Sequence, residues 1–139
     1  MRIILSFVIL IFFWTNTLIA EEYPNSWKMD ILCKQGKNEW YESSYVVNVE
    51  NNKFQLGPYD NKHWKRKNNK WVGEIKGNKI SVKETFQATW GSVSINFKGE
   101  FINENEATLK GRVPYDNPWI CKGRFFKVDR PPHFTSLKY

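Results

Sequence analysis

One five-residue pattern recurs four times in this chain: a bulky apolar residue, any residue, glycine, a charged residue and a second apolar residue. Side chains two residues apart lie on the same face of an extended strand, so both apolar residues share a face with the glycine. A glycine between two large inward side chains marks a strand that bends sharply or is closely approached, as a small curled sheet requires. The four copies are Trp71–Ile75, Phe97–Phe101, Leu109–Val113 and Cys121–Phe125.

The first twenty residues have the pattern of a secretory signal. Arg2 supplies a positive start, an uncharged apolar run follows from Ile3 to Trp14, and a more polar stretch ends at the small residue Ala20. A membrane anchor is the alternative, but the apolar run is short for a span and no basic stop-transfer flank follows it. We therefore expect residues 1–20 to be a signal peptide cleaved near Ala20. The mature protein would be secreted or periplasmic, with no transmembrane segment.

The remaining residues have the length of one domain with a single core. Cys33 and Cys121 are the only cysteines, and in an exported protein such a pair predicts one structural disulfide. A metal pair or a reactive thiol is the alternative interpretation. Neither cysteine has a neighbouring His or second Cys at ligand spacing, so the sequence predicts no metal site and no cofactor.

Apolar residues alternate with polar ones almost throughout, and no stretch keeps a helical stripe. The longest break in the alternation runs from Gly57 to Asn69 and predicts a loop, with Gly57-Pro58 and Asp60-Asn61 as turn signals. Beyond Val128 two prolines predict the end of strand structure and leave residues 129–139 as a tail. The predicted strands are 27–34, 41–49, 54–56, 71–76, 80–90, 93–101, 107–113 and 121–125.

The spacing of the last three pattern glycines favours an up-and-down meander. Gly99, Gly111 and Gly123 are 12 residues apart, which fits one strand and one turn per repeat. A sheet of this length hides its apolar face by closing or folding over. The sequence thus predicts an all-β domain over residues 21–128, a single antiparallel meander of about eight strands closed into a small barrel. A disulfide between Cys33 and Cys121 would join the first strand to the last across the closing seam, and a β-sandwich is the alternative.

The order of these motifs resembles a group of small exported bacterial proteins. The shared features are Trp27 six residues before Cys33, the Trp-x-Gly-x-Ile-x-Gly-Asn run from Trp71 to Asn78, and the later glycine motifs that end at Phe125. The resemblance covers Trp27 to Val128 and implies a barrel of the avidin or lipocalin sort, with no assigned activity. The chain lacks the Gly-x-Trp opening of true lipocalins, so ligand transport is not implied.

Catalytic groupings are sparse. His63 and His133 have no Ser or Cys beside them in a motif that activates a nucleophile. No phosphate-binding glycine loop, metal-binding helix or calcium loop is present. We therefore predict that the protein is not an enzyme. Two carboxylates could in principle pair for general acid–base chemistry, but nearly all of the candidates lie at positions predicted to be outward-facing or in turns. The candidates are Glu21, Glu22, Glu74, Glu84, Glu100, Glu104 and Glu106.

Two sets of residues are candidates for binding. An eight-stranded barrel has room inside for side chains or for one small ligand, so the aromatic residues could either line a pocket or fill it. The segment around the predicted loop combines cations with aromatic rings, which suits an anionic chain, although solvated lysines that protect a sheet edge are the alternative. The first set is Trp27, Tyr45, Trp71, Phe97 and Phe125; the second is His63, Trp64, Lys65, Arg66, Lys67 and Lys70.

The leading hypothesis is an exported, non-catalytic barrel that binds a small apolar or aromatic ligand, with the 57–70 loop as its lid or mouth. The alternative is a cationic envelope-associated module whose 57–70 loop binds anionic lipid or polysaccharide rather than nucleic acid. The chain carries 21 Lys and Arg against 14 Asp and Glu, which is compatible with such a partner and equally with a solubilising surface. An inhibitor of a secreted hydrolase, acting through a protruding loop, is the third possibility.

Overall fold

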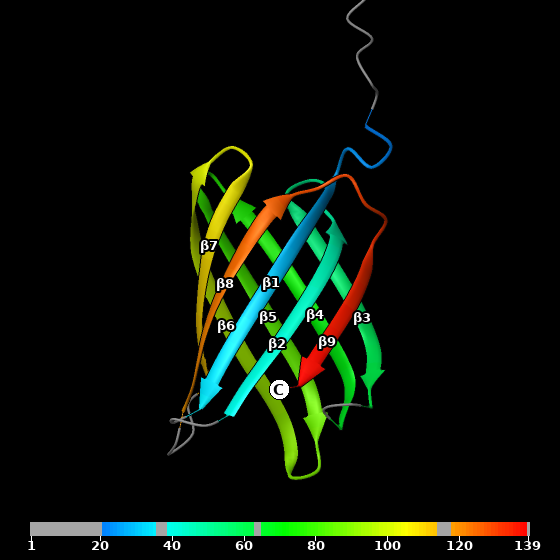
Figure 1. The fold of residues 1–139 in the computed structure, drawn as a ribbon, viewed down its shortest axis with the longest axis vertical. Coiled ribbons are helices and arrows are strands. Elements are labelled where there is room, and N and C mark those ends of the chain that lie inside the picture. Colours follow the sequence, from blue (N-terminus) through cyan, green and yellow to red (C-terminus); the bar gives the residue numbers. More distant parts are fainter. Residues whose placement is uncertain (1–20, 36–38, 63–64, 114–117, 139) are drawn as a thin grey trace, which may run out of the picture.

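A computed structural model describes residues 21–35, 39–62, 65–113 and 118–138. Within these residues all regular structure is extended, and nine antiparallel strands form one sheet (Figure 1). The alternation of apolar and polar residues produces this result because each strand buries one face and exposes the other. The strands are β1 (Ser26–Gln35), β2 (Glu39–Asn48), β3 (Lys53–Asn61), β4 (Arg66–Lys76), β5 (Lys79–Ala88), β6 (Gly91–Asn103), β7 (Glu106–Val113), β8 (Trp119–Lys127) and β9 (His133–Lys138).

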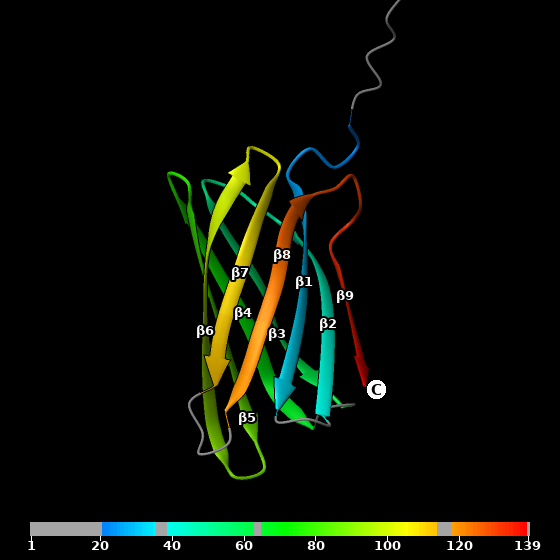
Figure 2. The ribbon, with the colours of Figure 1, turned by 60° about the vertical axis from the view of Figure 1, so that its left-hand side comes forward.

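Strands β1 to β8 form the predicted meander, and the sheet curls into a nearly closed barrel. Each of β3 to β7 pairs with the next strand along the chain, β8 pairs with β1, and β1 pairs with β2 (Figures 1 and 2). Cys33 and Cys121 are direct partners across this junction and form the predicted disulfide. The bond links residues 88 positions apart. Closing a loop of that length stabilises the fold by on the order of 4 kcal/mol through the unfolded chain.

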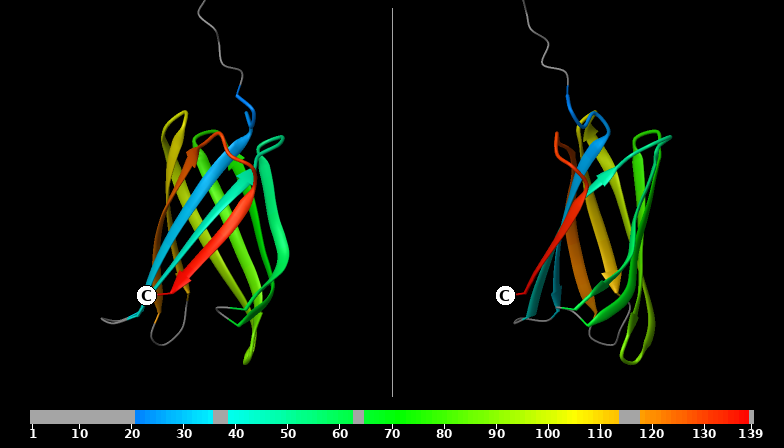
Figure 3. Two further views of the ribbon diagram at one scale, coloured as in Figure 1. Left: turned by 45° about the vertical axis from the view of Figure 1, so that its right-hand side comes forward. Right: turned by 90° about the vertical axis from the view of Figure 1, so that its right-hand side faces the viewer.

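The barrel is interrupted between two strands that are consecutive in sequence. β2 and β3 are not hydrogen-bonded neighbours in the sheet; a bridge between Glu50 and Lys53 lies at their connecting turn. Strand β9 pairs instead with the edge of β2, along Tyr41 to Val46 (Figure 3). The prediction that strand structure ends at Val128 is therefore wrong. The two prolines lie in the connection between β8 and β9 and do not prevent a further strand. Residues 133–138 form that strand because the free edge of β2 offers backbone groups for pairing.

The predicted loop from Gly57 to Asn69 is also wrong in its extent. Most of that segment belongs to β3 and β4, which pair with each other. The pairing contains register shifts after Leu56 and after Tyr59, and the pairing of β4 with β5 shifts between Lys67 and Lys70. A bulge moves the following residues to the opposite face, so the alternation that marks a strand is lost in the sequence.

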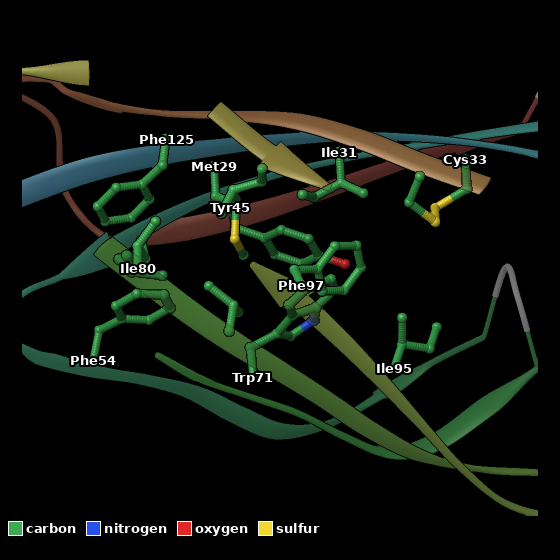
Figure 4. Close-up of a cluster of buried hydrophobic side chains, with 14 of the residues drawn as sticks. Met29, Ile31, Cys33, Tyr45, Phe54, Trp71, Ile80, Ile95, Phe97 and Phe125 are labelled. Carbon is green, nitrogen blue, oxygen red and sulfur yellow. A yellow bond between two sulfur atoms is a disulfide. The ribbon is translucent and has the colours of Figure 1, made fainter. Parts of the chain in front are cut away.

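Large side chains fill the middle of the barrel (Figure 4). The Trp71 ring lies 4.7 Å from Tyr45 and 5.5 Å from Phe97, measured between ring centroids. Toward the end that holds the β6–β7 turn, the Phe125 ring stacks on Trp27 at 4.8 Å and on Phe54 at 5.4 Å. These stacked rings bury much of the apolar area that drives folding.

The pattern glycines make room for these side chains. Phe97 on β6 is the cross-strand partner of Gly111 on β7, and a Cβ atom at residue 111 would lie 2.5 Å from the Phe97 ring. Gly99 pairs with Leu109, and a Cβ atom there would collide with the backbone carbonyl oxygen of Thr108. The sequence pattern predicted either a sharp bend or a close approach at each glycine. At Gly99 and Gly111 the structure shows a close approach of atoms from the neighbouring strand.

Gly99→Ala should be among the most damaging small substitutions in the chain. The added methyl group would meet a backbone atom, which cannot move away as a flexible side chain could. We expect a loss of about 3 kcal/mol in the free energy of unfolding, or failure to fold, in line with overpacked cores. Urea unfolding measures the effect. Ser94→Ala, on the exposed face of the same strand, should change stability by less than about 0.5 kcal/mol. Equal stability of the two variants would contradict this account of the glycines.

Candidate functional site

A buried ion pair lies inside the barrel near the end that holds the β5–β6 turn. The side chain of Glu84 on β5 is fully buried and that of Arg66 on β4 is 12% exposed. Glu84 Oε1 accepts hydrogen bonds from Arg66 at 2.7 Å and from the Asn69 amide at 2.9 Å. The Arg66 guanidinium also lies over the Phe86 ring, 4.2 Å from its centroid. A buried carboxylate needs such partners because desolvation of an unpaired charge is costly.

The prediction that Glu84 belongs with the outward-facing or turn carboxylates is therefore wrong. It lies between Val82 and Phe86 in the alternation of β5, and both of those residues are buried. Its position in this alternation already indicated the interior. The usual exposure of glutamate was the competing signal, and its cationic partner could not be recognised within a segment predicted to be a loop.

Further polar groups extend this cluster across the interrupted side of the barrel. Asn61 on β3, the pairing partner of Arg66, is buried, and the buried Tyr59 hydroxyl interacts with Tyr45 on β2. Ser43 on β2 is buried as well. Burial raises the pKa of Tyr59 to about 12, side-chain hydrogen bonds with Tyr45 and Trp71 lower it, and the Glu84 charge raises it. The polar interior thus comes from β2 to β5, the strands that border the break in the sheet.

A cavity of about 200 Å³ opens beside this cluster, at the barrel end that holds the β5–β6 turn. Arg66 lines one side of it, and the charge of Arg66 is balanced by Glu84 at 2.7 Å. Lys65 and Trp90 lie at the rim, where Trp90 is 72% exposed. The remaining lining is predominantly apolar: Phe86, Ala88, Thr89, Val93, Ile95, Val113 and Trp119.

The structure brings together the five aromatic residues predicted to contact a ligand, in the packed interior. Four of them are fully buried, namely Tyr45, Trp71, Phe97 and Phe125, and Trp27 is half-buried. None of the five lines the 200 Å³ cavity. The residues that do line it come from the start of β4, the β5–β6 turn and the adjacent ends of β5 to β8. Sequence analysis assigned Phe86, Val93, Ile95 and Val113 to strand faces without separating cavity from core, because both consist of inward apolar residues.

The predicted cationic segment is divided between two environments. Arg66 turns into the barrel, where Glu84 neutralises it. Lys65 and Lys67 are exposed and Lys70 is half-buried. His63 and Trp64 lie outside the described residues. The segment is thus not a single outward cationic surface among the residues that can be placed.

No family model, curated protein or solved structure matches this chain. The functional argument therefore depends on the residues of this chain alone.

Over residues 21–35, 39–62, 65–113 and 118–138, no three His, Cys, Asp or Glu side chains gather as they would around a metal ion. In the same ranges, no helix has the length and apolar character required to cross a bilayer.

The ion pair gives a test of how the polar interior is held. Arg66→Met would leave the Glu84 carboxylate buried without its cation, and we expect a loss of about 3–5 kcal/mol in unfolding free energy. Adding Glu84→Leu to this variant should recover most of the loss, because an apolar pair of similar volume has no charge to desolvate. Urea denaturation of the single and double variants measures the difference. A double variant less stable than the Arg66→Met variant would contradict the assignment.

Tyr59 gives a pH test with a defined sign. Its folded-state pKa of about 12 exceeds the ordinary value of 10.0, so the folded protein holds this proton more tightly than the unfolded chain. The contribution is complete below pH 10 and is lost as the pH rises toward 12. Tyr59→Phe should flatten the fall in stability across this window, measured by denaturant unfolding at several pH values. The control variant is Tyr23→Phe, at a residue that precedes β1. It should keep the wild-type dependence of stability on pH, and an equal effect of both substitutions would argue against a special role for Tyr59.

Proposed function

We propose that the protein is an exported, non-catalytic binding module that holds a small, uncharged, apolar or aromatic molecule at one end of its barrel. The observation that carries the proposal is the cavity of about 200 Å³ with predominantly apolar walls. Apolar cavities of about 150 Å³ can bind benzene, whereas drug-sized ligands occupy about 300 Å³ or more. The size therefore suits a single ring or a short acyl chain.

The charges around the cavity support an uncharged ligand. Arg66 contributes a positive charge to the wall, but Glu84 lies 2.7 Å from it and cancels that charge locally. Lys65 is exposed at the rim, where water screens it. Binding would then come from apolar contact with Phe86, Val93 and Val113, with little dependence on salt.

Non-catalytic binding fits the chemistry of the cavity. Its lining holds two cations, one threonine and otherwise apolar or aromatic side chains. General acid–base work needs a carboxylate, histidine or similar group within hydrogen-bond reach of the reacting atoms. Glu84 lies behind Arg66 and does not line the cavity. The arrangement thus favours holding a molecule over transforming it.

Titration with phenol and indole as one- and two-ring probes tests this proposal. Trp90 and Trp119 line the cavity, so tryptophan emission should change on binding and the change should persist at high salt. Val113→Phe places a ring in the cavity and should abolish the response. Val72→Phe makes the same change on the outer face of β4, where Val72 is 42% exposed, and should leave the response intact. An unaltered response in the Val113→Phe variant would refute the proposed site.

A further inference from the structure

The outer face of β5 to β8 carries a cluster of cations that form no ion pair with any carboxylate of the described residues. All members of the cluster are exposed. Toward the end with the β6–β7 turn, by contrast, cations on the same strands are paired, as in Lys79–Glu100 and Arg124–Glu106. The cluster, called here the cationic face, consists of Lys83, Lys98, Lys110, Arg112 and Lys122.

The register places these cations in two rows that cross the strands. Lys98, Lys110 and Lys122 are direct partners on β6, β7 and β8. Two residues along, a second row contains Lys83, Asn96 and Arg112. Like charges directly opposite each other on neighbouring strands lower stability. Three lysines in one row are therefore costly for the free protein, and an anionic partner would offset that cost.

A shallow groove runs between the two rows. On β6 to β8 it is lined by Lys98, Lys110 and Lys122 on one rim and by Asn96, Arg112 and Ile120 on the other. On β4 to β6 it continues between Glu74, Ser81 and Lys98 on the first rim and Val72, Lys83 and Asn96 on the second. Glu74 forms an ion pair with Lys76 and marks the end of the cationic part of the groove. Inward-pointing residues form its floor, including Gly73 and Gly111. Its cationic part spans four strands, roughly 14 Å at the backbone.

The shape of this groove selects among anionic partners. Four strands cover about half the circumference of an eight-stranded barrel, so the rows follow a convex surface that a flat bilayer cannot contact throughout. A single flexible chain can follow the curve and meet both rims. The rims have no aromatic residue on which bases could stack. The disulfide is compatible with an oxidising, non-cytoplasmic compartment, where nucleic acid is a less common partner. Both observations count against nucleic acid.

We infer that the cationic face binds one linear acidic polysaccharide, laid across β5 to β8 with its carboxylate or sulfate groups between the two rims. The inference is independent of the cavity at the barrel end. It also differs from an anion site in the 57–70 segment, because the cations that carry it lie on other strands.

The test compares two triple variants with the same change in net charge. One replaces Lys98, Lys110 and Lys122 with Gln. The control replaces Lys53, Lys62 and Lys67, which are exposed on β3, its following turn and β4. Polygalacturonate and heparin serve as probes in calorimetric titrations. Binding by the unaltered protein should weaken about 100-fold between about 50 and about 200 mM salt, as expected when about five cations release counterions.

The groove variant should lose about tenfold or more in affinity and show a shallower salt dependence, while the control keeps both. An affinity loss confined to the control would move the site to the 57–70 segment and overturn the inference. Absence of binding to both polymers at low salt would also overturn it. Binding to phosphatidylglycerol vesicles or to a single-stranded oligonucleotide, with neither polysaccharide bound, would assign the face to a different partner and refute this one.

A second variant separates binding from folding. Lys110→Glu places a carboxylate between Lys98 and Lys122, so it should relieve their repulsion and raise Tm by a few degrees. The same change should weaken polysaccharide binding, because it removes a cation and adds a repelling charge. Stability and affinity would then move in opposite directions. A fall in both would show that Lys110 matters for the fold alone and would contradict the inference.

Discussion

The limited volume inside a small closed sheet is the constraint on which the rest of this structure depends. Eight strands enclose little more than their own side chains, so bulky residues cannot face each other at every position along neighbouring strands. The register solves this by placing glycine opposite the large side chains. Phe97 faces Gly111, and Leu109 faces Gly99 on one side and Gly123 on the other. With side chains at those glycines, the strands could not approach closely enough for β8 to reach β1.

Apart from one register shift at the end of the β6–β7 pairing, the irregular features of the barrel lie among β2 to β5 and β9. They are the register shifts in β3 and β4, the break between β2 and β3 and the added strand β9. The buried polar cluster around Glu84 comes from these same strands. Bulges often re-aim side chains near sites. Here one lies between Lys67 and Lys70, a stretch that contains Asn69 and follows Arg66, the two residues that donate hydrogen bonds to Glu84. The regular half acts as a scaffold and the irregular half positions the polar groups beside the cavity.

The features that sequence analysis recovered are those with a local period. Alternation and the glycine spacing gave the strands of the regular half, the antiparallel meander and its closure, and the cysteine pair gave the disulfide. The failures involve long-range pairing. Strand β9 exists because β2 has a free edge, which nothing near His133 encodes. The outward prediction for Glu84 followed the usual exposure of glutamate, and its partners Arg66 and Asn69 lie within the segment that was predicted to be a loop. The two rows of cations could not be predicted without the pairing register of β5 to β8, because their members are far apart in sequence.

The two-residue period of a strand explains how two distinct surfaces occur on the same strands. On β7, Val113 lines the apolar cavity while its neighbour Arg112 belongs to the cationic face. On β6, Ile95 lines the cavity and Asn96 the groove. The barrel wall between them is one backbone thick, yet the inner cavity is locally neutral and the outer groove strongly positive. Successive side chains point to opposite faces, so either surface can change in chemistry without altering the other. A backbone shift that narrowed the groove would, however, displace the cavity wall, so any coupling between the two would have to travel through strand geometry.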